Sequence, residues 1–95
     1  MGTRDAYIDK LKARIDAWNA DIDRMQAEAK EAGADARIRY EEAVRDMRRQ
    51  RDEAEQKLAE ARDASESAWK DMQTGFERAW DDISHAFAAA TQRFR

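Results

Sequence analysis

The sequence predicts an all-α fold: long antiparallel coiled-coil helices in a three-helix-bundle arrangement, closed within one chain or by a domain-swapped dimer. Charged residues make up 41% of the 95-residue chain and proline is absent, which is typical of long helices and coiled coils. Apolar residues recur at steps of three and four, which places them on one side of a helix. A chain of 95 residues is predicted to form a single helical coiled-coil domain over residues 1–95.

Three helical segments are predicted, over residues 3–32, 36–62 and 65–94. In the first segment the apolar residues form a stripe, the seam, in which steps of three and four alternate as in a coiled coil. The seam of the second is weaker, because alanine buries little area, and the third is rich in Trp and Phe and continues to Phe94. The residues predicted to form the helix-packing interface are Ile8, Leu11, Ile15, Trp18, Ile22, Met25, Tyr40, Met47, Leu58, Trp69, Met72, Phe76, Trp80, Ile83 and Phe87.

The first connection has two interpretations. Gly33 is a preferred residue just past a helix end, and Asp35 is placed to cap a following helix. A glycine inside a helix costs only about 1 kcal/mol, however, and the seam keeps its phase through Gly33, so residues 3–62 also fit one continuous helix. A turn closes the bundle within one chain. A continuous helix leaves a groove that residues 1–32 of another copy would fill in an antiparallel, domain-swapped dimer.

The second connection carries the stronger break signal. Asp63 and Glu66 have the spacing of a capping box, which predicts a helix start with Asp63 as the cap. If both connections turn, the bundle places Trp18, Met47 and Trp80 near one layer. Gly75 is expected to leave space for a large neighbour such as Trp18 against the backbone.

The composition excludes several classes of function. There is no cysteine, so disulfides, thiolate catalysis and Cys-based metal sites are excluded. The formal net charge is −3, with Arg and acidic residues intermixed, so no nucleic-acid partner is expected. The first residues lack the apolar core of a secretory signal, and no segment is apolar enough to span a bilayer. We therefore expect a cytoplasmic protein.

No catalytic, metal-binding or cofactor-binding constellation stands out, so the protein is not expected to be an enzyme or to hold a cofactor. His85 is the only histidine, and with Asp81 it supplies two ligands where a protein metal site needs three or four. Interleaved acidic residues neutralise much of the best nucleic-acid candidate, and an ion-paired solvent face is favoured there. That basic cluster comprises Arg45, Arg48, Arg49 and Arg51.

The third segment also has the apolar face, rich in Trp and Phe, of a helix that lies on a membrane surface. Reversible binding to a lipid or membrane surface is therefore the alternative function. Its polar face is as acidic as it is basic, and the first segment offers a matching apolar stripe, so packing within the bundle is favoured.

The stretches DAYIDKLKARIDAWNADIDRMQAEAK and RDEAEQKLAEARDASESAWKDMQTGFERAWDDI resemble a family of small bacterial coiled-coil proteins, commonly labelled stress-response proteins. They are also loosely similar to the amphipathic repeats of apolipoproteins. The most specific parts are the Ile/Leu/Trp spacing around Trp18 and the stretch SAWKDMQTGFERAWDD. The resemblance implies a helical, non-enzymatic protein associated with stress, and it supplies no catalytic motif.

The sequence therefore predicts a non-enzymatic structural or interaction protein that acts through helix–helix association. A homodimer is the favoured assembly, and a helix of another protein is the other protein partner considered. Binding to a lipid surface is retained as the alternative.

Overall fold

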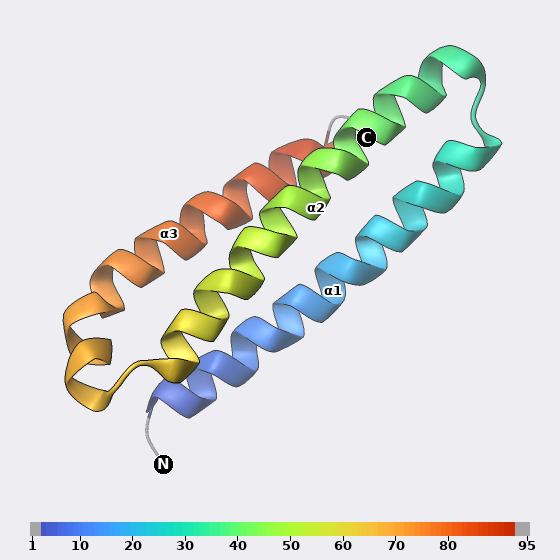
Figure 1. Ribbon diagram of the computed structural model, residues 1–95. Coiled ribbons are helices and arrows are strands. Elements are labelled where there is room, and N and C mark those ends of the chain that lie inside the picture. The colour runs from blue at the N-terminus through green and yellow to red at the C-terminus, as the bar shows by residue number, and fades with distance from the viewer. Residues whose placement is uncertain (1–2, 93–95) are drawn as a thin grey trace.

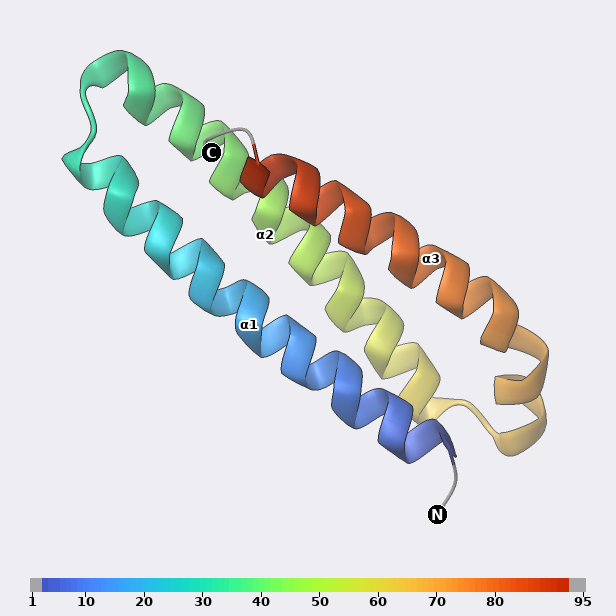
Figure 2. The ribbon, with the colours of Figure 1, turned by 180° about the vertical axis from the view of Figure 1, so that it is seen from behind.

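The computed structural model describes residues 3–92, which form three helices connected in an up-down-up order (Figures 1 and 2). They are α1 (Thr3–Glu31), α2 (Ala34–Asp63) and α3 (Glu66–Gln92). The bundle is a rod with extents of 52 × 20 × 19 Å. The predicted all-α three-helix bundle is confirmed. Phe94, at the end of the predicted third stripe, lies outside the described residues.

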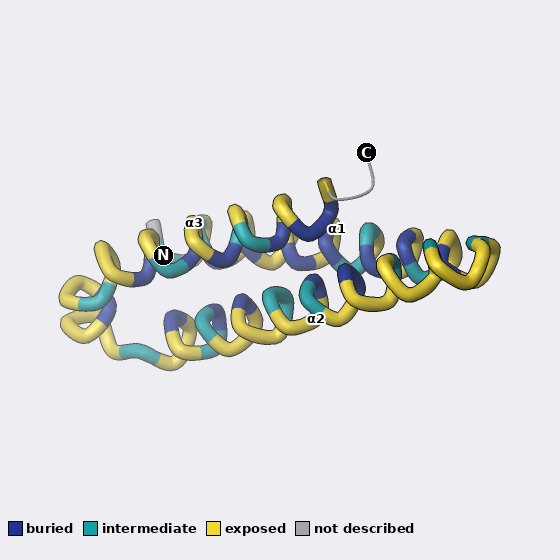
Figure 3. The backbone as a smooth tube through the Cα atoms, turned by 90° about the horizontal axis from the view of Figure 1, so that it is seen from above, coloured by how far each residue is buried: buried dark blue, intermediate teal, exposed yellow. Residues whose placement is uncertain are grey.

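The core runs along the inner sides of the three helices, while the charged residues cover the outer sides (Figure 3). Cα atoms of α2 come within 8 Å of those of both α1 and α3, whereas none of α1 comes that close to α3 within residues 3–92. Small side chains explain the close approach of α2, because Ala43, Ala54 and Ala61 have 0% of their surface exposed. Larger side chains fill the wider space between α1 and α3.

Gly33 forms the first turn, so the chain does not continue as one helix over residues 3–62. Gly33 occupies the N-cap position of α2 with φ −66° and ψ 166° and has no side-chain cap. Its carbonyl accepts a hydrogen bond from the backbone N–H of Arg37 at 2.8 Å. The prediction that Asp35 is the cap was wrong. Asp35 lies in the first turn of α2, where its negative charge suits the helix dipole.

Ser65, and not Asp63, caps α3. The Ser65 hydroxyl accepts a hydrogen bond from the backbone N–H of Ala68 at 3.1 Å, and its carbonyl accepts one from Trp69 at 2.8 Å. Asp63 is still helical, as the last residue of α2. The backbone N–H of Ala64 still donates to the carbonyl of Glu60 at 3.1 Å, which keeps Asp63 in the last turn of α2, so the predicted capping box does not form.

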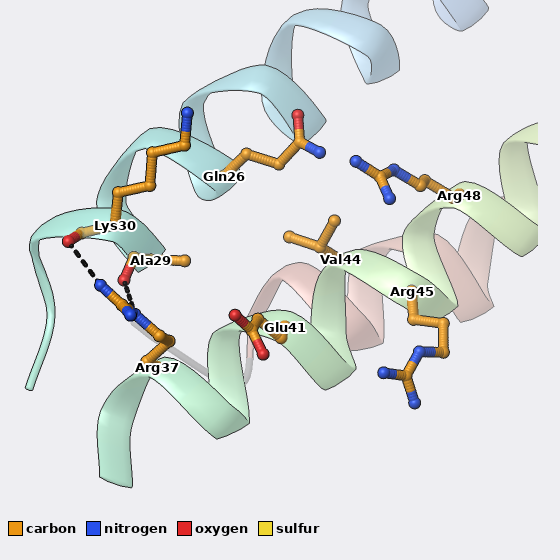
Figure 4. Close-up of a pocket in the computed structure, with 8 residues that line it drawn as sticks. All are labelled: Gln26, Ala29, Lys30, Arg37, Glu41, Val44, Arg45 and Arg48. Carbon is orange, nitrogen blue, oxygen red and sulfur yellow. Dashed lines mark hydrogen bonds between the residues drawn. The ribbon is translucent and has the colours of Figure 1, made fainter. Parts of the chain in front are cut away.

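At each turn, an arginine side chain from a neighbouring helix donates to backbone carbonyls near the helix end. The side chain of Arg37 donates hydrogen bonds to the carbonyls of Ala29 at 3.3 Å and Lys30 at 3.0 Å (Figure 4). At the other end of the rod, Arg4 donates to the carbonyl of Ala64 at 2.6 Å. The last carbonyls of a helix have no partner within that helix, so each arginine supplies a donor and places positive charge at the negative end of a helix dipole.

Gly75 does not receive Trp18 as predicted. Gly75 is exposed, and a Cβ atom placed on it would meet nothing within 4 Å. It lies on the rim of a shallow groove between α2 and α3. Trp18 packs instead against side chains of α3.

We predict that Ser65→Ala lowers the free energy of unfolding by about 1 kcal/mol, because the N–H of Ala68 loses its acceptor. Asp63→Ala is the matched control and should leave stability unchanged or slightly raised, since an acidic residue at a helix C-terminus opposes the dipole. Urea unfolding followed by circular dichroism measures both changes. A larger loss in Asp63→Ala than in Ser65→Ala would contradict the capping assignment.

Candidate interaction surfaces of the bundle

Trp18 joins α1 to α3 through two stacked contacts. Its ring centroid lies 5.5 Å from that of Trp80, with 13° between the planes. The centroid of Phe87 lies 4.6 Å away on a plane inclined by 14°. All three side chains are buried. Aromatic pairs at these distances add attraction beyond the area that they bury, so this group is a strong link between helices whose backbones stay apart.

Tyr7 forms a second aromatic group nearer the start of α1. Its ring lies 6.1 Å from that of Trp69 and 5.9 Å from that of Phe76, in an edge-to-face arrangement. Tyr7 and Trp18 thus each sit between two α3 aromatics spaced seven residues apart. The two groups together fix the parallel register of α1 and α3.

The structure places the predicted packing residues together in one core. All of the fifteen are buried except Tyr40 and Met72, which are half-buried against it. Their prediction as an interface between molecules remains a prediction, because the contacts described here lie within one chain. Six smaller residues that lie on the apolar seams of the sequence, but were not included among the fifteen interface residues, are also buried: Ala29, Ala43, Val44, Ala54, Ala61 and Ala90.

Tyr7 is electrostatically distinct among these aromatics. Burial raises the pKa of its hydroxyl above the ordinary value of 10.0, and the negative charges of Glu77 and Asp81 on α3 raise the pKa further. Each effect disfavours the ionised phenolate. The fold therefore favours the neutral form of the Tyr7 side chain over the phenolate.

A groove of about 540 Å³ lies between α1 and α2 near the first turn. We call it the outer groove, and Figure 4 shows its lining, with α3 behind the helix pair. Ala29 and Val44 are buried and form its floor. Arg48 extends from α2 toward Gln26 of α1 (Figure 4). The complete lining is Gln26, Ala29, Lys30, Arg37, Glu41, Val44, Arg45 and Arg48.

The arginine cluster noted in the sequence does not form one continuous surface. Arg45 and Arg48 line the outer groove. Arg49 forms an ion pair with Asp46. Arg51 donates hydrogen bonds to Asn19 of α1 at 2.9 Å and to Asp52 at 3.0 Å. Because Arg49 and Arg51 are paired with acidic residues, the local density of arginine overstates the basic surface that a ligand would meet.

His85 lies on the exposed face of α3, as does Asp81. Over residues 3–92, no group of three or more His, Cys, Asp or Glu side chains converges where it could hold a metal ion. The described helices also include none with the length and apolar character needed to cross a bilayer.

Comparison of this chain with protein-family models, with curated proteins and with solved structures gives no match. The interpretation of its surfaces therefore depends on the geometry and charge described above.

We predict that Trp80→Ala lowers the free energy of unfolding by about 3–5 kcal/mol, because it removes a buried ring that stacks on Trp18. Ile38→Ala is the control, since Ile38 is 57% exposed and a surface change of this kind stays within about 0.5 kcal/mol. Thermal and urea unfolding of both variants measure the difference. Unchanged stability in Trp80→Ala would rule out the aromatic link between α1 and α3.

We predict a loss of stability at alkaline pH that depends on Tyr7. The raised pKa in the fold means that the stabilisation is complete below the unfolded-state pKa of about 10 and is lost as pH rises through the folded-state pKa. Urea unfolding of the wild type and of Tyr7→Phe at about pH 9 and about pH 11 tests this. The wild type should lose more stability between these values, whereas equal losses would contradict the prediction.

Proposed function

We propose that the protein is a non-enzymatic structural and interaction protein that works through helix–helix association, and that it forms a homodimer by exchanging α1. The first connection supports this proposal. Ala32 and Gly33 alone separate α1 from α2. The φ of −66° at Gly33 is open to any residue, and no side chain packs within 4 Å of its Cβ position. The turn is held by the side chain of Arg37 and by a hydrogen bond from the backbone N–H of Ala32 to the carbonyl of Ala29 at 3.3 Å.

Straightening this connection exchanges one set of hydrogen bonds for another. The carbonyls of Ala29 and Lys30, which accept from Arg37 in the closed bundle, would accept from the backbone N–H groups of Gly33 and Ala34 in a continuous helix. The apolar seam of α1 would pack into the same groove of another copy, so its buried area is retained. The equilibrium between the closed monomer and the exchanged dimer then depends mainly on the helix propensity of the hinge residues and on protein concentration.

Non-enzymatic action is the other part of the proposal. The core is filled by apolar side chains, and the His85 and Asp81 side chains singled out in the sequence lie on an exposed helix face. An association with stress enters the proposal through the sequence resemblance alone.

Reversible lipid binding is a second candidate. The aromatic face of α3 reaches α1 only through side chains, with no close approach of the two backbones in the described residues. If α3 separated from the bundle, Trp69, Trp80 and Phe87 would form the apolar face of an interfacial helix. Flotation with anionic vesicles distinguishes this candidate from exchange of α1, which keeps these rings buried.

We predict opposite effects of two substitutions at the hinge. Gly33→Ala favours a continuous helix by about 1 kcal/mol in each chain, which should raise the dimerisation constant about thirtyfold. Ala34→Pro should favour the monomer, because proline suits the first position of α2 but costs about 3 kcal/mol inside a helix. The extended conformation of Gly33, with ψ 166°, is also the one that a following proline requires.

Light scattering across a concentration series measures both effects against a chain mass of 11.0 kDa. The expected order of dimer content is Gly33→Ala, then wild type, then Ala34→Pro. If the molar mass in solution equals that of the monomer for both wild type and Gly33→Ala at every concentration, the proposed homodimer is overturned.

A further inference from the structure

We propose that the outer groove is a docking site for an acidic, amphipathic helix supplied by a partner protein. This inference rests on the proposed function in helix–helix association and adds to it a site and the chemistry of the segment bound there. Three features of the groove carry it: its charge, its floor and its length.

The charge of the outer groove is strongly one-sided. Of its five charged side chains four are basic and only Glu41 is acidic, although the chain as a whole has a net charge of −3. Lys30, Arg45 and Arg48 are exposed and form no ion pair with another residue of the described part of the chain. Arg37 adds its positive charge while it holds the end of α1. Complementarity therefore calls for a negatively charged occupant.

The floor of the outer groove distinguishes between acidic occupants. Ala29 and Val44 present short apolar side chains among the basic residues that line the groove (Figure 4). The volume of about 540 Å³ accommodates side chains but not a whole helix. A helix can lay an apolar stripe on this floor with carboxylates on both sides of it. A phosphate backbone would use only the cationic residues and would leave the floor uncovered, so we favour the helix over nucleic acid.

The length of the outer groove sets the size of the partner segment. On α2 the lining extends from Arg37 to Arg48, which is about 16 Å at 1.5 Å per residue, or three helical turns. Arg37, Arg45 and Arg48 lie on the same face of α2 because their positions are separated by about two turns and by about one turn. A partner helix of three turns with Glu at steps of three and four would place its carboxylates along this row.

A synthetic peptide is the probe for this proposal. It has about 15 residues, with leucine on one helical face and glutamate on both flanks, and the control peptide has the same composition in an order that scatters the leucines. Fluorescence anisotropy with the full chain measures both affinities at low salt. The amphipathic peptide should bind at least about tenfold more tightly than the scrambled one, because only it can cover the apolar floor.

Two charge-matched variants locate the binding. Arg45→Gln combined with Arg48→Gln should weaken peptide binding about fivefold or more, in keeping with the loss of two ion pairs. Lys70→Gln combined with Arg78→Gln removes the same charge from the exposed face of α3 and should leave the affinity unchanged. All four substituted residues are exposed, so both variants should fold, which thermal unfolding verifies.

Three results would overturn the docking proposal: equal binding of the two peptides, equal weakening in the two double variants, or duplex DNA binding that is lost in Arg45→Gln/Arg48→Gln while the peptide does not bind. The hinge variants show whether a negative result concerns the docking site or the proposed homodimer. Dimerisation of Gly33→Ala without peptide binding would remove the docking site alone. Peptide binding to a chain that stays monomeric would support the docking site and remove the homodimer.

Discussion

Ala43, Ala54 and Ala61 have no exposed surface, and the packing of the whole bundle depends on the small size of their side chains. Because α2 presents methyl groups to its neighbours, its backbone comes close to both α1 and α3. The two outer helices cannot then come equally close to each other without large side chains between them. Trp18, Trp80 and their aromatic neighbours fill that space. Small and large residues thus have complementary roles in one core, as close packing requires.

The same arrangement explains why the chain needs so few polar contacts to define its turns. Each connection is about two residues long, so the helix ends are fixed by the length of the buried seams. What remains is to satisfy the free carbonyls at the end of each helix, which Arg37 and Arg4 do from a neighbouring helix. These contacts are polar and partly exposed, and they are weak beside the core. A turn held in this way can be exchanged for a continuous helix without disturbing the seam, which is the physical basis of the proposed homodimer.

Charged residues are unevenly distributed over the surface of the bundle, although basic and acidic residues are intermixed along the sequence. Four basic side chains line the outer groove, whereas acidic residues of α3 stand near Tyr7 and raise the pKa of its hydroxyl. The basic groove and the acidic neighbours of Tyr7 are thus two local concentrations of charge on one narrow rod. In the docking proposal, local charge of this kind distinguishes among the many amphipathic helices that could otherwise fit a groove.

The sequence by itself determined which segments are helical, their approximate limits and the face that each one buries, because helical periodicity is a local property that packing only has to satisfy. It also placed Trp18 and Trp80 in one layer, as found. It could not decide between a turn and a helix at Gly33, because the seam stays in phase in both cases. Nor could it identify Ser65 as the cap, because aspartate and serine both suit an N-cap and α2 continues through Asp63 in the structure.

Only the tertiary structure decided which charged residues share a surface. Lys30 and Arg48 are far apart in the sequence and line one groove, while Arg49, which is adjacent to Arg48, forms an ion pair with Asp46 instead. The outer groove exists because two antiparallel helices bring Ala29 beside Val44. A pattern along one helix contains no information on that pairing, which is fixed by side-chain volumes summed across the interface.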